Sequence, residues 1–279
     1  MIKSALKKLK TLHRLIVEYK NISFLATSLY EYLKLRFSLD KQYVESRKGV
    51  FMFRLPNGLR AITLANPKYL RAYVATYGEI FVMGIYDQCK DFIPIKHDIV
   101  LDLGAFIGLY TLKHYKAERI FTFEPHPISY ILLYNNVKLN ELKNVRCFNY
   151  AIWCQNGHLP LYEDKFLVSS SATALKSYKG SPQKKFIVRA VSIDQLINQR
   201  ILPPHIDIAK VDIEGSEVEF LEGGAESLSR GRINRIIIEV HKTEINLRKF
   251  YDKLRELNFK VVHKMTYYKS DIVYAIHIK

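Results

Sequence analysis

The chain is poor in cysteine and has no long apolar run. Its three cysteines, Cys89, Cys147 and Cys154, include no C-x-x-C pair. A sparse, odd set argues against a disulfide framework and for reduced thiols. No apolar run approaches the roughly 20 residues that span a bilayer, and no signal-peptide core follows the basic start. We therefore expect a cytoplasmic protein.

Acidic residues are also scarce, because 27 Asp and Glu stand against 43 Lys and Arg, a formal net charge of +16. Residues 1–60 hold 13 of the basic residues and 4 of the acidic ones, so this part carries +9. Such a surplus suits nucleic acid, anionic lipid or an acidic partner. We interpret residues 1–48 as a basic, helical N-terminal segment.

Residues 1–20 place apolar side chains at helical spacing with lysines between them. A basic amphipathic helix of this kind packs on a domain or partner, or lies on a membrane surface. The segment lacks Trp and Phe, which favours packing. Peripheral contact with the inner membrane face is the alternative interpretation.

The most informative stretch is 99–108, an apolar run that ends at Asp102 and continues into a turn with two glycines. Strand, tight turn and helix in this order open a nucleotide-binding βαβ unit. A dinucleotide fingerprint needs glycine at its first, third and sixth positions. Here those positions hold Gly104, Phe106 and Leu109, which argues against NAD.

Two acids indicate which nucleoside cofactor fits. Asp102 lies directly before the turn, where a carboxylate repels phosphate but holds an ammonium group. S-adenosylmethionine (SAM) carries an ammonium group and no phosphate. Glu124 ends the next apolar strand, where a carboxylate accepts the ribose hydroxyls of a nucleoside. Ala151 and Ile152 follow the third strand and are expected to border the adenine, so the residues favour SAM.

From residue 98 onward the pattern alternates strand and helix, which predicts a parallel sheet covered on both faces. Strands are expected near 98–103, 119–124, 145–150, 207–212, 234–240, 259–264 and 271–278. Helices are expected near 108–116, 127–140, 192–198, 216–228 and 244–257. The last two strands form a hairpin, so one of them is antiparallel. Residues 50–64 predict a further β-hairpin that turns at Asn57-Gly58.

Four stretches together resemble SAM-dependent methyltransferases of the FkbM family, which have the class I methyltransferase fold. They are residues 100–108, 123–127, 210–217 and 237–241. The resemblance covers roughly residues 50–279, and its one departure is Phe106, where the family usually has Asn or another small polar residue.

The resemblance implies a doubly wound α/β fold with a mostly parallel seven-stranded sheet and a C-terminal antiparallel hairpin. The methyltransferase domain is expected over residues 49–279, with a catalytic core at about 95–279. The residues expected to bind the cofactor are Asp102, Gly104, Ala105, Phe106, Gly108, Glu124, Pro125, Ala151, Ile152 and Asp212.

The implied reaction is O-methylation of a hydroxyl on a sugar, glycan, glycolipid or small metabolite. The residues expected around the acceptor, as general base or its partners, are Asp212, Glu214, Glu239 and His241. The same carboxylates and imidazole suit a divalent cation, but their spacing is not diagnostic, and we expect no metal.

Two other functions compete with this interpretation. The basic balance favours a nucleic-acid methyltransferase, although no Asn-Pro-Pro-Tyr motif is present and the surplus lies away from the expected site. A membrane-associated module that keeps the fold without turnover is the other, and Phe106 is the feature that hints at it.

Overall fold

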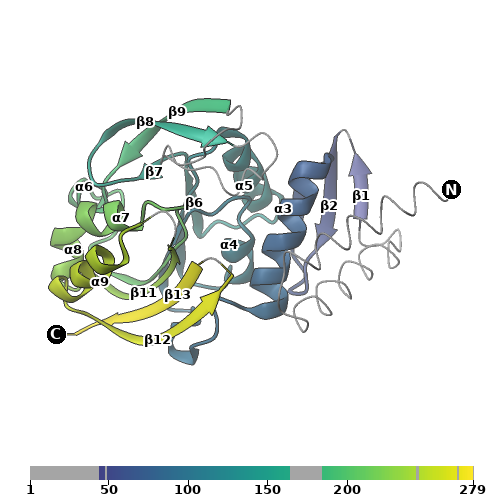
Figure 1. Cartoon of the computed structure of the whole chain (residues 1–279). Coiled ribbons are helices and arrows are strands. Elements are labelled where there is room, and N and C mark those ends of the chain that lie inside the picture. The colour runs from purple at the N-terminus through teal and green to yellow at the C-terminus, as the bar shows by residue number, and fades with distance from the viewer. Residues whose placement is uncertain (1–43, 48, 164–183, 243–244, 269, 279) are drawn as a thin grey trace. The chain divides into compact units, whose positions relative to one another are not determined.

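The computed structural model describes residues 44–47, 49–163, 184–242, 245–268 and 270–278 (Figure 1). Residues Ser46–Lys279 form one compact unit. The helical segment expected over residues 1–48 lies almost wholly outside the described residues. No helix in the described part of the chain is long and apolar enough to cross a membrane.

A seven-stranded sheet forms the centre of this unit, with the order β12-β13-β11-β10-β4-β5-β6. Its strands are β4 (Ile99–Leu103), β5 (Arg119–Phe123), β6 (Val145–Phe148), β10 (Ile206–Val211), β11 (Ile233–His241), β12 (Phe259–Tyr267) and β13 (Ser270–His277). β13 runs opposite to the other six strands and pairs antiparallel with β11 and β12. The predicted sheet and its C-terminal hairpin are therefore confirmed.

Alternation along the strands divides the sheet into two faces. One face carries apolar side chains such as Leu101, Leu103 and Val211, which belong to a single buried core with Phe220 and Phe250 of the helices. The helices on this side are α6 (Ile193–Asn198), α7 (Glu217–Gly223), α8 (Ala225–Ser229) and α9 (Leu247–Glu256) (Figure 1). The predicted helix 216–228 is thus broken in two at Gly224.

The opposite face carries polar residues in the middle of the sheet. Asp102 of β4 lies beside Lys210 of β10, and Asp102 bonds Thr111 of the next helix. The helices on this side are α4 (Leu109–Lys113) and α5 (Pro127–Leu139) (Figure 1). Because β4 pairs with both β5 and β10, the sheet changes winding direction at the carboxyl end of β4, where α/β folds bind their ligands.

The segment before the sheet confirms the predicted hairpin and adds a covering layer. The elements are β1 (Val44–Arg47), β2 (Val50–Arg54), β3 (Arg60–Leu64), α3 (Pro67–Tyr77), a π-helical turn η1 (Gly78–Met83) and a 3₁₀ turn η2 (Lys90–Phe92). The buried Asn136 of α5 accepts from Ile62 N at 2.6 Å and donates to Ile62 O at 3.2 Å, which satisfies the edge of β3. The hairpin is thereby fastened to α5.

A second small sheet was not predicted. It contains β7 (Ala151–Ile152), β8 (Gly157–Glu163) and β9 (Lys184–Val191), in the order β7-β9-β8. Along β9, Val188 and Ala190 are buried while Ile187 and Arg189 are exposed. This one-sided alternation is a weak signal in the sequence, and β9 pairs with strands that lie more than 20 residues earlier in the chain.

Candidate active site

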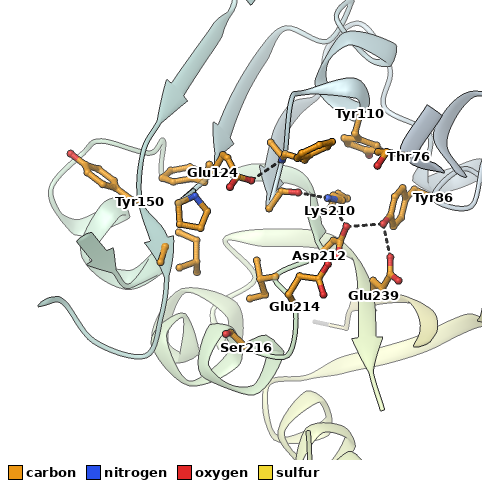
Figure 2. Close-up of a pocket in the computed structure, with 18 of the residues that line it drawn as sticks. Thr76, Tyr86, Tyr110, Glu124, Tyr150, Lys210, Asp212, Glu214, Ser216 and Glu239 are labelled. Carbon is orange, nitrogen blue, oxygen red and sulfur yellow. Dashed lines mark hydrogen bonds and ion pairs between the residues drawn. The ribbon is translucent and has the colours of Figure 1, made fainter. Parts of the chain in front are cut away.

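A cavity of about 270 Å³ opens at the carboxyl ends of β4, β5, β10 and β11 (Figure 2). The residues that line it are Ala72, Ala75, Thr76, Glu79, Ile80, Tyr86, Gly104, Ala105, Phe106, Tyr110, Phe123, Glu124, Pro125, Tyr150, Ala151, Ile152, Trp153, Leu161, Lys210, Asp212, Ile213, Glu214, Ser216 and Glu239. Figure 2 shows Glu124 and Tyr150 at one end, and Tyr86 and Glu239 at the other. The cavity therefore has a largely apolar end and an acidic end.

The turn after β4 needs glycine for two reasons. Gly104 has φ +74°, and a Cβ placed on it would lie 1.7 Å from the carbonyl oxygen of Asp212. Gly108 has φ +89°, and a Cβ there would lie 2.6 Å from Leu133 Cδ1. The first contact is with backbone, so only glycine lets the β4 turn pack against the end of β10.

Glu124 is held facing the cavity by backbone donors. Its Oε2 accepts from Phe106 N and its Oε1 from His126 N, both at 2.8 Å. Phe106 takes a positive φ of 53°, which aims its N–H at this carboxylate. Burial raises the pKa of Glu124 to about 8, although both backbone bonds oppose the shift. Each oxygen keeps a lone pair for a further donor, such as a ligand hydroxyl.

Apolar and aromatic side chains line the Glu124 end of the cavity. Ala151 and Ile152 lie there as predicted by position, together with Pro125, Tyr150 and Trp153. Phe106 also lines the cavity and is only 5% exposed, and its ring stacks on that of Tyr69 with 6.5 Å between the ring centroids. A flat apolar group fits this end of the cavity.

Asp102 does not line the cavity, although its position at the strand end suggested that it would. It is fully buried under the turn, where its Oδ2 accepts from Thr111 Oγ1 at 2.7 Å. Its Oδ1 lies 3.6 Å from Lys210 Nζ. The structure thus places Asp102 behind the wall, where it acts on a ligand through Lys210 rather than directly.

Lys210 is a site residue that sequence reasoning missed. Its ammonium donates to Gly104 O at 2.9 Å and lies 3.3 Å from Asp212 Oδ2, with its side chain only 3% exposed. Burial opposes its charge, but the carboxylates of Asp212 and Asp102 outweigh burial and raise the pKa of Lys210. A lysine inside the apolar strand 206–211 was the signal that could have identified it.

Tyr86 joins the two acids at the far end of the cavity (Figure 2). Its hydroxyl lies 2.6 Å from Glu239 Oε2 and 3.1 Å from Asp212 Oδ2. Glu79 of η1 lines the same end, and its pKa is raised by burial and by Glu239 and Asp212. Neither Tyr86 nor Glu79 was predicted, because the segment that carries them has no recognisable motif.

His241 lies behind Glu214 and does not line the cavity itself. Its Nδ1 is 2.7 Å from Glu217 Oε1, and its Nε2 is 3.4 Å from Glu214 Oε2. Burial lowers the pKa of His241, but the nearby carboxylates of Glu214 and Glu217 have the larger combined effect and raise it. An imidazole that keeps its proton is a poor base, so the arrangement favours a carboxylate as the proton acceptor.

The acids predicted for the acceptor side do converge. Asp212, Glu214 and Glu239 line the acidic end together, and the pKa of Glu214 is raised to about 8, mainly by burial. The pKa of Glu239 is also raised, mainly by burial and then by the negative charge of Asp212. The end of the cavity thus offers proton acceptors tuned toward neutral pH, as general bases require.

Comparisons with known proteins identify the family of this chain. The model of the methyltransferase FkbM domain matches residues 102–261, more than half of the chain. Methyltransferase sdnD of Sordaria araneosa is 28% identical over 53% of this chain and 67% of its own length. The hexuronic acid methyltransferase AglP of Haloferax volcanii is 26% identical over 52% of this chain, and the matched part is 56% of that relative.

The crystal structure of methyltransferase FkbM from Methylobacillus flagellatus KT is similar at 16% identity and a TM-score of 0.46. The match covers 64% of this chain and 44% of that one. The family assignment rests on the domain match, which begins at Asp102 and includes the β4 turn, Glu124 and the Asp212–His241 strand ends. The chain belongs to the FkbM methyltransferase family.

Proposed function

We propose that this protein is a SAM-dependent methyltransferase that methylates a hydroxyl group of a sugar, glycan, glycolipid or small metabolite. The observation that carries the proposal is one continuous cavity with Glu124 fixed at its apolar end and a cluster of carboxylates at its other end. A nucleoside fits the first end, and a hydroxyl acceptor fits the second.

The residues at the apolar end fit the nucleoside part of SAM. The two free lone pairs of Glu124 suit the two ribose hydroxyls, and the wall formed by Ala151, Ile152 and Tyr150 suits a flat base. Gly104 and Ala105 of the β4 turn also line the cavity, and we assign the methionine part of SAM to them. SAM supplies an electrophilic methyl group on a positively charged sulfur.

Charge also favours a cationic cofactor at this place. Among the described residues that line the cavity, Lys210 carries the only positive side chain, against five acids. These acids are Glu79, Glu124, Asp212, Glu214 and Glu239. Burial raises the pKa of four of these acids, and a sulfonium and an ammonium group placed beside them would favour their ionised forms, so the cationic cofactor and the acids would stabilise each other more than the neutral-sulfur product would.

The acidic end fits the acceptor hydroxyl. A neutral alcohol is a poor nucleophile, so its proton must pass to a base as the new O–C bond forms and the C–S electron pair returns to sulfur. Glu214, with its pKa raised to about 8, is the best matched base among the acids. A sugar acceptor is supported by the archaeal relative, which is a hexuronic acid methyltransferase.

Calorimetric titration of the full chain with SAM and S-adenosylhomocysteine tests the proposal. Glu124→Ala removes the acceptors of two hydroxyl bonds. In a titration at about pH 9, above the raised pKa of Glu124, each bond to the charged carboxylate is worth about 1.5–3 kcal/mol, so we expect a loss of about 100-fold or more in affinity. Glu118→Ala is the control, because that side chain is 55% exposed.

Two further measurements make the result decisive. Thermal unfolding shows whether Glu124→Ala is folded, and Glu124→Gln, which keeps the size of the side chain, replaces it if it is not. Labelled methyl donor with glycan and lipid extracts then identifies the acceptor class. A folded wild-type protein that binds neither SAM nor S-adenosylhomocysteine would overturn the proposal.

A further inference from the structure

Three potential metal ligands meet beside the acidic end of the cavity. Asp212 follows β10, Glu214 lies in the loop after it, and His241 ends β11. One ligand atom from each residue lies within 4.8 Å of the other two. All three lie at the carboxyl edge of the sheet, and Asp212 and Glu214 also line the cavity.

The imidazole of His241 is oriented for this role. Its Nδ1 lies 2.7 Å from Glu217 Oε1, so Nε2 is turned toward the other two carboxylates. Ligating histidines in proteins are commonly fixed by a carboxylate on the second ring nitrogen. A histidine held in this way distinguishes the cluster from a set of acids on a surface.

Glu217 adds a buried negative charge beside the three potential ligands. It is 0% exposed, and its Oε1 accepts from Gly215 N at 3.0 Å in addition to contacting His241. Its Oε2 is buried and has no hydrogen-bond partner within the described residues. A fully buried carboxylate is costly unless a cation lies nearby; in the free protein that cation is the protonated His241, and a bound metal ion would take its place.

Asp212 divides its two oxygens between two tasks. Its Oδ2 contacts Tyr86 at 3.1 Å and Lys210 at 3.3 Å, whereas Oδ1 faces His241 Nε2 at 4.0 Å. The remaining contact, from Nε2 to Glu214 Oε2, is 3.4 Å. The two contacts of His241 Nε2, at 4.0 Å and 3.4 Å, are longer than ordinary hydrogen bonds, and the three ligand atoms lie within 4.8 Å of one another.

The same separations fit a shared cation. Two ligands about 2.1 Å from one ion lie about 3 Å apart at a right angle and about 4 Å apart when opposite. The 3.4 Å and 4.0 Å contacts of His241 Nε2 lie in that interval, and the two carboxylate oxygens, which lie within 4.8 Å of each other, would close on the ion. Two carboxylates and one imidazole suit Mn²⁺ or Mg²⁺ better than the softer metals that select thiolates.

We propose that Asp212, Glu214 and His241 bind a divalent cation such as Mn²⁺, with Glu217 as the residue that positions the imidazole. The cation replaces the proton on Nε2, since both compete for the same lone pair. Resting on the proposed function, its role is to hold the acceptor hydroxyl at the acidic end of the cavity. A hydroxyl bound to the cation would lose its proton more readily, and with Glu214 serving as a ligand the proton would pass to Glu239, which lines the same end of the cavity.

Titration of the full chain with Mn²⁺ tests the proposal without any substrate. Electron paramagnetic resonance measures binding as the loss of the free-ion signal. We expect one ion per wild-type chain, and at least a 100-fold loss of affinity in Asp212→Asn and in His241→Gln. Glu217→Gln keeps the shape of the positioning residue but weakens its bond to Nδ1, so we expect a 10–100-fold loss.

The control is Glu222→Gln, which lies on α7 as Glu217 does. The Glu222 carboxylate pairs with Lys249 at the surface, at 2.8 Å. The variant should bind Mn²⁺ like the wild type. Circular dichroism confirms the fold of each variant, and His241→Gln carries the conclusion if Asp212→Asn is unfolded. Absence of bound Mn²⁺ at millimolar concentration in the wild type, or equal affinity in His241→Gln, overturns the inference.

The two proposals fail separately. A protein that binds SAM but not Mn²⁺ keeps the proposed function and loses the cation site. A protein that binds Mn²⁺ through His241 but neither SAM nor S-adenosylhomocysteine keeps the cation site and loses the proposed function.

Discussion

Replacing Gly104 by alanine tests the closest backbone approach in the site. Gly104 has φ +74°, and the added Cβ would lie 1.7 Å from the carbonyl oxygen of Asp212 and 2.8 Å from its carbonyl carbon. Gly58 in the N-terminal hairpin has φ +86°, but a Cβ there meets nothing within 4 Å. Comparing Gly104→Ala with Gly58→Ala therefore separates the cost of a left-handed alanine from the cost of the clash with the Asp212 carbonyl.

The magnitude follows from the contacts around the turn. A left-handed conformation costs an L-residue roughly 1–2 kcal/mol, and this is the whole effect expected for Gly58→Ala. Ordinary contact begins at 3.4 Å, so in Gly104→Ala the turn and the end of β10 must separate by about the remaining 1.7 Å. That movement breaks the 3.0 Å bond from Asp212 N to Leu103 O and the 2.9 Å bond from Lys210 Nζ to Gly104 O.

Losing one neutral and one charged hydrogen bond costs about 3–4 kcal/mol, so Gly104→Ala should lose about 4–6 kcal/mol of unfolding free energy. Urea denaturation of both variants measures the difference. In the same variant, calorimetry should show weaker SAM binding, because Asp212 and Lys210 move with the strand end. A Gly104→Ala protein within about 0.5 kcal/mol of Gly58→Ala would refute the close packing of the β4 turn on β10.

Three further predictions concern buried polar and charged groups. Lys210→Met leaves Asp102 buried without its cation and should cost about 3–5 kcal/mol in urea denaturation; a double variant with Asp102→Asn should recover part of that loss, and no recovery would contradict the pairing. Tyr86→Phe removes the hydroxyl between Asp212 and Glu239 and should cost about 1–3 kcal/mol, whereas a loss below about 0.5 kcal/mol would show that the bridge is not formed. Because burial raises the pKa of Glu124 from 4.5 to about 8, its ionised form destabilises the fold, so stability should fall as pH rises between these values. The wild type should lose about 1.4 kcal/mol per pH unit relative to Glu124→Gln in this window, and a difference independent of pH would refute the shift.

The strand ends could be predicted from local pattern alone. An apolar run that ends in an acid marks the carboxyl end of a buried strand, and parallel strands share that edge. For this reason Glu124, Asp212 and Glu239 were expected near one another, and all three line the cavity. The two glycines of the β4 turn were also predictable, because tight turns select residues without a Cβ.

The covering segment could not be predicted in the same way. Tyr86 and Glu79 come from a stretch of α3, η1 and irregular backbone that folds over the sheet, and nothing in their local pattern separates them from surface residues. Their contacts with Asp212 and Glu239 join residues more than 100 positions apart. The second sheet was missed for a similar reason, since β8 and β9 each depend on a distant partner.

The sequence by itself determined the alternation of strands and helices, the glycine turn and the acids at the strand ends, because these depend on backbone sterics and on the period of the apolar pattern. Only the tertiary structure decided that Asp102 lies behind the cavity wall, paired with Lys210, and that His241 turns toward Glu214. Those outcomes depend on strand register, which sets Lys210 opposite Asp102, and on the burial that makes unpaired charges costly.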